Sequence, residues 1–204
     1  MPHLVADVLG FADALGAPRF HVVGHDWGGL VAWSVAAQAP ERVRSLTAVS
    51  TPHPDAFRTA VTSDPEQMLR SSYIALFKAP LHTAETALLA FDAKALRASY
   101  EGKLPEAEVE ANVRRLSEDH TLTCALNWYR ALEFGEVTGP VRVPTTYVWG
   151  DQDVALRETA ALATAGYVHG PYRFERVVGG SHWLLEERPA ELAAWVLSRV
   201  KSTE

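Results

Sequence analysis

The sequence has 204 residues, of which 48% are hydrophobic and 22% charged, and its formal net charge is −6. This is an ordinary globular composition, and the length predicts one domain with room for an inserted lid. The acidic balance and the absence of a basic run argue against nucleic acid or a membrane as partner. A single cysteine, Cys124, excludes an internal disulfide and predicts a reducing, cytoplasmic location. No apolar run is long enough for a transmembrane helix, and no signal peptide is visible.

The N-terminal part of the chain alternates between helical and strand patterns. We expect a helix over about residues 3–16, a strand over Phe20–Gly24, a helix over about 27–39 and a strand over Val43–Ser50. A strand, a helix and a second strand in this order predict a right-handed parallel crossover.

The periodicity then changes, because no convincing strand pattern occurs between about Asp55 and Gly135. Helical patterns cover Asp64–Phe77, Ala84–Tyr100, Pro105–Leu116 and His120–Phe134. An all-helical insertion in an α/β alternation predicts a lid, which shapes a substrate pocket and excludes water from it. We therefore expect a core of residues 1–54 and 136–204 and a helical lid of residues 55–135.

The alternation resumes after this insertion and continues to the end of the chain. The pattern predicts a strand at Pro144–Trp149, a loop at Gly150–Asp153, a helix over about 155–165, a strand at Tyr172–Val178 and a closing helix at Pro189–Val200. The predicted fold class is α/β, with a mostly parallel sheet of about four strands and a helical insertion.

The most informative stretch of the sequence joins the strand at Phe20–Gly24 to the following helix. It contains the pattern Gly24-x-Asp26-x-Gly28-Gly29. A strand that turns directly into a helix leaves its corner residue strained with the side chain thrust outward, and small neighbours avoid collisions there. The pattern is therefore typical of a nucleophile elbow with Asp26 as nucleophile. The alternative is a plain turn in which Asp26 caps the helix.

An acid and a histidine follow in positions that favour the catalytic interpretation. Asp26, Asp153 and His182 each follow a predicted strand, and catalytic groups on open parallel sheets lie at the carboxyl ends of strands. The order nucleophile, acid, histidine is that of the α/β-hydrolase fold. Taken singly, His182 could be a loop histidine bonded to backbone, and Asp153 could be a turn or capping carboxylate.

An aspartate nucleophile implies displacement at a saturated carbon. The carboxylate of Asp26 is ionised at neutral pH, so it can attack without a base and form an alkyl ester. His182 would then deprotonate the water that hydrolyses this ester, and the Trp27 amide would stabilise the oxyanion. A halide leaving group needs weak donors, whereas an epoxide oxygen needs a proton, which Tyr73 or Tyr129 could supply. The alternative is that both tyrosines are packing residues of amphipathic helices.

These residues resemble the motifs of the α/β hydrolases of the epoxide hydrolase group. The resemblance is carried by the stretch from His21 to Gly29, by the Tyr73 stretch that runs on to Pro80 and Glu85, by Asn127-Trp128-Tyr129-Arg130, by Trp149-Gly150-x-x-Asp153 and by Gly180-Ser181-His182-Trp183. It implies Asp26 as nucleophile, His182 as water-activating base, Asp153 as its orienting acid, and Tyr73 and Tyr129 as proton donors. It also implies Trp27 and Trp183 at a site for a small apolar epoxide, with no cofactor and no metal.

The sequence departs from that group in one respect: it lacks the first strands and a His-Gly-x-Pro loop that supplies an oxyanion donor. One side of the strand Phe20–Gly24 is then uncovered, and such an edge favours pairing with a second copy of the chain. We expect either that Met1 is internal to a longer product or that the chain is a truncation with impaired activity that associates with another chain. Two further functions stay open, namely a haloalkane dehalogenase-like hydrolase and a non-catalytic remnant that binds a small ligand or a partner.

Overall fold

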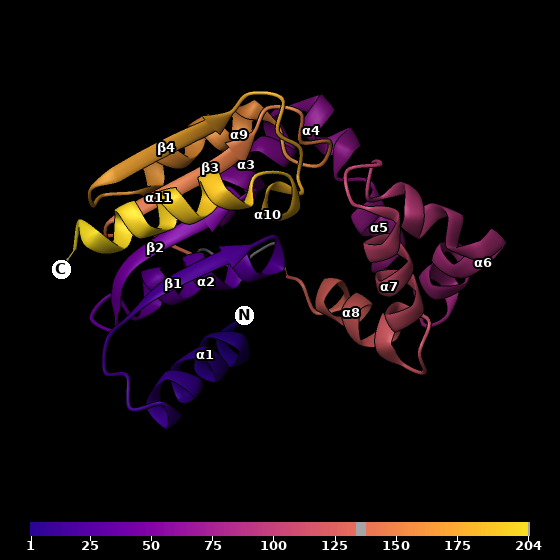
Figure 1. The fold of residues 1–204 in the computed structure, drawn as a ribbon, viewed down its shortest axis with the longest axis horizontal. Coiled ribbons are helices and arrows are strands. Elements are labelled where there is room, and N and C mark those ends of the chain that lie inside the picture. The colour runs from indigo at the N-terminus through magenta and orange to yellow at the C-terminus, as the bar shows by residue number, and fades with distance from the viewer. Residues whose placement is uncertain (134–137, 204) are drawn as a thin grey trace. The chain divides into compact units, whose positions relative to one another are not determined.

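The computed structural model describes residues 1–133 and 138–203, and the chain divides into two compact units (Figure 1). The first unit joins Met1–Leu69 to Gly135–Glu204, and the second is Arg70–Phe134. Among the described residues the strands all belong to the first unit, and the second is helical. The predicted α/β class with an all-helical insertion is confirmed.

Four parallel strands form one sheet in the order β1-β2-β3-β4. They are β1 (Phe20–His25), β2 (Val43–Val49), β3 (Thr145–Gly150) and β4 (Tyr172–Val177). Each boundary lies within one residue of the predicted one. The central strand β3 is buried along its whole length, as expected for an apolar strand covered on both faces. Within the described part of the chain β1 pairs with β2 alone, so its other side is uncovered there, as predicted.

Helices cover both faces of this sheet. Those that begin in the first unit are α1 (Pro2–Ala14), α2 (Trp27–Gln38), α3 (Pro54–Ser63), α4 (Pro65–Arg70), α9 (Glu158–Ala163), α10 (Leu184–Glu187) and α11 (Pro189–Lys201), with a 3₁₀ turn at Thr164–Tyr167. Ala48 and Tyr147 are register partners on the face that packs against α2 and α9. Their neighbours Val49 and Val148 face α10 and α11 on the other side.

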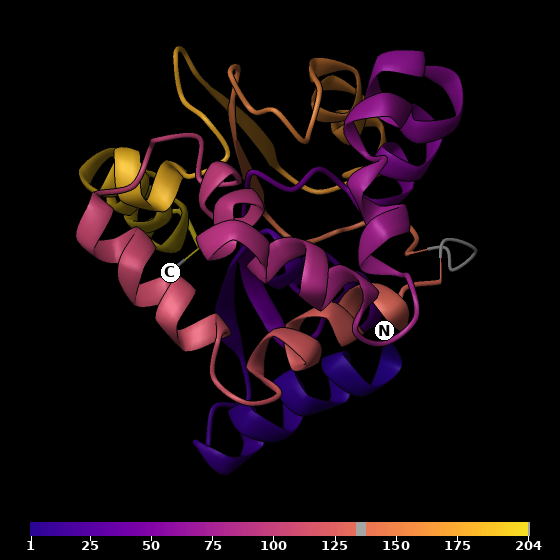
Figure 2. The same cartoon turned by 90° about the vertical axis from the view of Figure 1, so that its right-hand side faces the viewer.

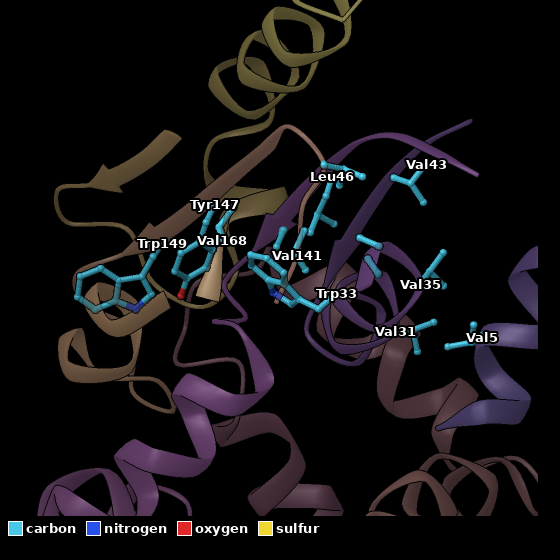
Figure 3. Packing of buried hydrophobic residues seen from close by; sticks show 14 of the residues in the cluster. Val5, Val31, Trp33, Val35, Val43, Leu46, Val141, Tyr147, Trp149 and Val168 are labelled. Atoms are coloured by element: carbon cyan, nitrogen blue, oxygen red, sulfur yellow. The ribbon is translucent and has the colours of Figure 1, made fainter. Parts of the chain in front are cut away.

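Two large aromatic side chains form the centre of the core on the α2 face (Figure 3). Trp33 of α2 and Tyr147 of β3 are both fully buried, and their rings meet edge to face with centroids 6.4 Å apart. Burying such rings supplies a large apolar area, but the indole N–H then needs an acceptor. Trp33 Nε1 donates to the backbone oxygen of Thr51 at 2.9 Å, so the core is tied to the end of β2.

The second unit is built from short amphipathic helices, which Figure 2 shows in magenta to salmon. They are α5 (Tyr73–Phe77), α6 (Thr83–Ala98), α7 (Glu106–Leu116) and α8 (Thr121–Arg130). The unit has its own buried cluster, formed by Ala84 with Leu88 and by Leu122 with Leu126, and the spacing of four residues places each pair on one helix face. No helix in the described part of the chain combines the length and the apolar character that crossing a membrane requires.

The helical region differs from the prediction in its first elements. The single helix predicted over Asp64–Phe77 is wrong: α4 and α5 are separate and a turn joins them. Asp64 caps α4, because its carboxylate accepts the Glu66 amide at 3.0 Å. Helix α3 was not predicted. It begins at a proline, and the His53 ring accepts the Asp55 amide at its start. Because α3 packs against α9, the compact helical unit begins later than residue 55.

The later helices lie where they were predicted, but they differ from the prediction in continuity and length. Helix α6 is interrupted at Ala90–Ala93, where Phe91, Asp92 and Ala93 have φ of 52°, 57° and 55°. This interruption has no glycine or proline to mark it in the sequence. The helix expected over 155–165 is shorter, since α9 gives way to the 3₁₀ turn. The last residue of the helix expected over His120–Phe134 lies outside the described residues.

A buried histidine predicts how the stability of the first unit depends on pH. His53 is fully buried, and burial lowers its pKa to about 4. The folded state therefore favours the neutral ring, and stability is lost as pH falls from about 6.5, the value for the unfolded chain, towards 4. The loss from this group should reach about 3 kcal/mol at pH 4.

His53→Gln isolates this contribution, because the amide of Gln keeps a donor for the Gly139 oxygen that His53 Nε2 binds at 2.9 Å. Urea unfolding at pH 7 and pH 4 measures the change in unfolding free energy for both proteins. We expect the change to be smaller in the variant. An equal change in the two proteins would contradict the assignment.

Candidate active site

Asp26 lies at a sharp turn between β1 and α2, with φ 51° and ψ −123°. A positive φ is costly for a residue other than glycine and occurs where the surrounding structure enforces it. The surrounding glycines explain how: a Cβ on Gly24 would lie 2.1 Å from the Gly28 oxygen, and one on Gly29 would lie 2.8 Å from Thr51 Cβ. A Cβ on Gly28 would meet nothing within 4 Å. The strained corner expected from the sequence is present, and two of its three glycines are required by close approach.

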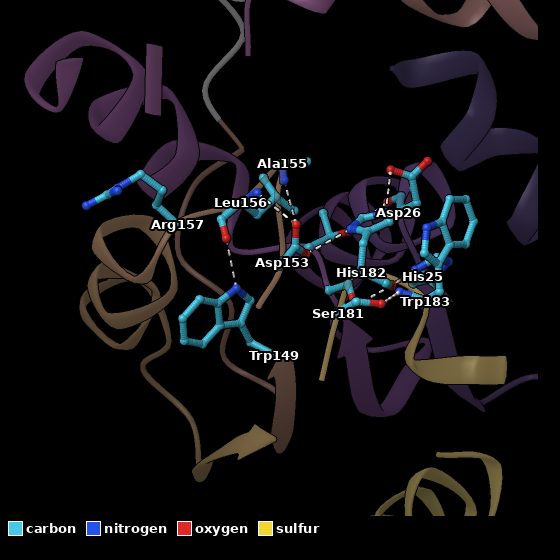
Figure 4. A network of polar contacts seen from close by, with 12 residues as sticks. His25, Asp26, Trp149, Asp153, Ala155, Leu156, Arg157, Ser181, His182 and Trp183 are labelled. Carbon is cyan, nitrogen blue, oxygen red and sulfur yellow. Dashed lines mark hydrogen bonds and ion pairs between the residues drawn. The ribbon is translucent and has the colours of Figure 1, made fainter. Parts of the chain in front are cut away.

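The predicted acid and histidine meet the aspartate at this turn (Figure 4). His182 Nδ1 donates to Asp153 Oδ2 at 2.9 Å, and His182 Nε2 lies 3.6 Å from Asp26 Oδ2. The other oxygen of Asp153 accepts the backbone amides of Ala155 and Leu156 at 2.8 and 2.9 Å. The Asp153 side chain is 0% exposed and that of Asp26 is 45% exposed. The imidazole is therefore oriented by a buried carboxylate and faces an accessible one.

The charges of the two carboxylates control the protonation of His182. Burial alone would lower its pKa, but the hydrogen bond to Asp153 and the attraction of both Asp153 and Asp26 raise the pKa to about 10. Desolvation opposes ionisation of Asp26, yet the interaction with the nearby His182 ring holds the pKa of Asp26 below its ordinary value. The two carboxylates therefore favour the protonated form of the His182 ring that lies between them.

Two tryptophans predicted at the site lie beside these groups. The backbone of Trp27 hydrogen-bonds to the Asp26 side chain, which contributes to its lowered pKa. This amide belongs to the first turn of α2, where amide groups point at an anion. The Trp183 ring stands edge-on to the His182 ring, with centroids 5.5 Å apart, and lies 6.2 Å from the His25 ring. The substrate-binding role expected for both tryptophans stays a prediction.

The histidine loop is held by groups to which the sequence analysis gave no role. The His182 backbone oxygen accepts His25 Nε2 at 2.9 Å and Ser50 Oγ at 3.0 Å. Glu187 accepts both the amide and the hydroxyl of Ser181 at 2.8 Å. His25 precedes the nucleophile, so its position was visible, but its partner is 157 residues away and no local pattern indicates the contact.

Tyr73 and Tyr129 meet within the helical unit. Their ring centroids are 6.1 Å apart, and Phe77 contacts both rings at 5.2 and 4.9 Å. Helices α5 and α8 therefore bring the two predicted proton donors into one aromatic cluster. Their roles stay predictions.

An ion pair beside this cluster ties the same helices together. Arg130, next to Tyr129, donates to both carboxylate oxygens of Glu85 at 3.0 Å and to the Ala79 oxygen at 3.1 Å. The hydrogen bonds and charge of Arg130, with a bond from Thr123, hold the pKa of Glu85 below its ordinary value against the effect of burial. The motif residues Glu85 and Arg130 thus join α8 to α6 and to the end of α5.

A metal site is not formed by the residues that the structure describes, because no group of three His, Cys, Asp or Glu residues there has a suitable arrangement.

Comparison with known proteins identifies the class. The alpha/beta hydrolase fold family matches residues 1–189, and the chain belongs to this family. Within it, the chain is 36% identical to Epoxide hydrolase 3 of Xenopus tropicalis over 94% of its length, and 34% identical to the AB hydrolase superfamily protein YfhM of Bacillus subtilis over 96%. The chain covers 55% of the Xenopus protein and 71% of the Bacillus one, so it spans about half the length of the first of these relatives.

A solved structure has the same fold. The epoxide hydrolase of Bacillus megaterium, determined in complex with an inhibitor, superposes with a TM-score of 0.83 at 22% identity. The match covers 97% of this chain and 74% of that one. The predicted resemblance to the epoxide hydrolase group is confirmed.

The close approach at the elbow predicts a difference between two neighbouring glycines. Gly24→Ala should destabilise the protein by at least about 3 kcal/mol, because its methyl group collides with backbone that cannot move aside. Gly28→Ala, the matched control, should change stability by less than about 1 kcal/mol. Urea unfolding measures both, and equal midpoints for the two variants would contradict the geometry.

The charge arrangement predicts how His182 titrates. Asp26→Asn removes one of the two anions that hold the imidazolium, so the pKa of His182 should fall. Asp13→Asn, which removes an exposed carboxylate paired with Arg42, serves as the control and should leave the pKa of His182 unchanged. Titration of the His182 ring by ¹⁵N NMR decides the point, and an unchanged pKa in Asp26→Asn would show that the two groups are not coupled.

Proposed function

We propose that the chain carries the machinery of an epoxide hydrolase, which opens an epoxide to a vicinal diol through an ester on Asp26. The observation that carries the proposal is the pair formed by a half-exposed Asp26 carboxylate and a His182 ring 3.6 Å away, backed by the buried Asp153. The relatives named epoxide hydrolase support the substrate class. A small apolar epoxide is the proposed ligand.

In the first step, an oxygen of Asp26 attacks one carbon of the epoxide ring. The carbon–oxygen bond breaks, and Tyr73 or Tyr129 gives a proton to the departing oxygen. The products are a hydroxyl group and a carboxylate ester of Asp26. The carboxylate needs no activation for this attack, since the charge of His182 keeps Asp26 ionised.

In the second step, the loss of charge on Asp26 changes the state of His182. Ester formation removes one of the two anions that raise the pKa of His182, so this pKa falls and the ring gives up its proton, which passes through solvent to the phenolate that the first step left on the donor tyrosine. The neutral ring then takes a proton from a water molecule, and the hydroxide attacks the ester carbonyl of Asp26. The Trp27 amide stabilises the oxyanion of the tetrahedral intermediate. When this intermediate collapses, the proton of its hydroxyl group passes to the leaving alkoxide, which releases the diol and regenerates the Asp26 carboxylate.

The helical unit is the proposed lid for this reaction, consistent with the predicted insertion of residues 55–135. It holds both tyrosines in one cluster, which supports the proposal that they act together as the acids. The uncovered side of β1 is the proposed place for pairing with a second copy of the chain. The cytoplasmic location inferred from Cys124 also stays a prediction.

A single turnover in ¹⁸O-labelled water tests the covalent step. The first diol released should be unlabelled, because its new oxygen comes from Asp26, and one ¹⁸O atom should remain in the Asp26 carboxylate. Mass spectrometry of the Asp26 peptide measures the label, with Asp26→Asn as the control. Label in the diol alone would mean direct attack by water and would refute the ester.

Two tyrosine variants test the proton donors. Tyr73→Phe and Tyr129→Phe should each slow epoxide opening by roughly 10- to 100-fold, because a general acid contributes on the order of 10²–10⁴ in rate and each phenol is one of two. Rates of ester formation are compared with those of the unmodified protein.

Chloride release from a panel of chloroalkanes is measured for the unmodified protein and for the two tyrosine variants. Release that Tyr129→Phe leaves undiminished would favour a haloalkane dehalogenase-like activity instead. Absence of both activities in the unmodified chain, with ligand binding retained, would favour the non-catalytic alternative.

A further inference from the structure

Two adjacent hydroxyl side chains at the end of β2 reach the backbones of both central residues of the site. Ser50 Oγ donates to the His182 oxygen at 3.0 Å. Thr51 Oγ1 donates to the Asp26 oxygen at 3.0 Å. One dipeptide therefore contacts the nucleophile loop and the histidine loop, which are 156 residues apart in the chain.

Neither carbonyl needs the hydroxyl in order to be paired. The His182 oxygen also accepts His25 Nε2 at 2.9 Å, and the Asp26 oxygen also accepts the Leu30 amide at 3.0 Å. A second donor on an oxygen that already has one adds little to its satisfaction but restricts its direction. The hydroxyls thus fix the orientation of the backbone carbonyls of His182 and Asp26, the two residues whose side chains face each other.

The backbone at this dipeptide is strained and anchored. Ser50 has φ 52° and is 0% exposed, and its amide donates to the Val148 oxygen of β3 at 2.8 Å. Glycine would adopt this conformation more easily, so a serine at this position keeps a strained backbone. The serine also supplies the hydroxyl that binds the His182 oxygen. Thr51 is held in turn by the indole of Trp33, which donates to its backbone oxygen at 2.9 Å.

We infer that Ser50 and Thr51 are positioning residues that set the approach of His182 to Asp26. The inference rests on the proposed function for its kinetic consequences, but the geometry it describes exists without turnover. Ser50 acts on His182, so it should govern hydrolysis of the ester. Thr51 acts on Asp26, so it should govern formation of the ester.

Four variants separate positioning from folding. Ser50→Ala removes the hydroxyl and keeps the strain, whereas Ser50→Gly removes both. Thr51→Val removes the hydroxyl at nearly constant shape, and Thr51→Ser keeps it. Urea unfolding should show Ser50→Gly to be at least as stable as Ser50→Ala, so any shared defect of these two variants comes from the hydroxyl and not from instability.

The kinetic readout divides the two steps. Ser50→Ala and Ser50→Gly should slow ester hydrolysis by about tenfold and let the Asp26 ester accumulate, as seen by mass spectrometry of the quenched enzyme. Thr51→Val should slow ester formation by about tenfold with no accumulation, and Thr51→Ser should restore the rate. Equal slowing of both steps by every variant, or no slowing, would overturn the inference.

A second readout needs no substrate. ¹⁵N NMR of the His182 ring should show a changed pKa in Ser50→Ala and Ser50→Gly but not in Thr51→Ser. If the protein opens no epoxide, the proposed function fails and this measurement still tests the positioning. An unchanged His182 titration in both Ser50 variants would refute the positioning of His182 whatever the activity.

Discussion

The turn at Asp26 is the constraint on which the rest of the first unit depends. Its positive φ forces β1 directly into α2, and the close approach leaves no room for a side chain at Gly24. The strain persists because a closed set of contacts surrounds it: α2 buries Trp33, Trp33 binds the Thr51 oxygen, and the Thr51 hydroxyl binds the Asp26 oxygen. The turn is thus held by the same core that stabilises the sheet, and the carboxylate projects from it at the carboxyl end of a parallel strand.

Two carboxylates flank one imidazole, and their environments assign them different parts. Asp153 is wholly buried and accepts two backbone amides in addition to His182, so its oxygens are occupied and its orientation is fixed. The Asp26 side chain is 45% exposed, and its Oδ2 lies 3.6 Å from His182 Nε2. Of the two carboxylates, only that of Asp26 is accessible to a carbon atom of a bound molecule. On the proposed mechanism the first step removes the charge of Asp26, so the same event that forms the ester lowers the pKa of His182 and prepares the base for the second step.

Local sequence patterns were enough to predict the strands and the residues that follow them. Apolar or alternating runs placed the four strands of the described residues within one residue, and strand ends placed Asp26, Asp153 and His182 at one edge of the sheet. The pattern failed where a cap or a tertiary contact overrides periodicity, as at Asp64, which starts a new helix, and at Ala90–Ala93, where no breaker residue stands. Contacts such as that of Ser50 with His182 join side chains to distant backbone, and no spacing rule in a single sequence reports them.

The two compact units each hold their own group of candidate catalytic residues. Asp26, His182 and Asp153 are fixed to one another by bonds within the first unit, whereas Tyr73 and Tyr129 are fixed to one another through Phe77 in the second. The Glu85–Arg130 pair, with the bond of Arg130 to the Ala79 oxygen, ties α8 to α6 and to the end of α5 within the helical unit. On the proposed function, the geometry of the acids is therefore specified independently of the geometry of the nucleophile and base. On that proposal, substitutions that reshape the helical unit are expected to change which epoxides are opened, while the bonds from His25, Ser50 and Asp153 that orient His182 stay within the first unit.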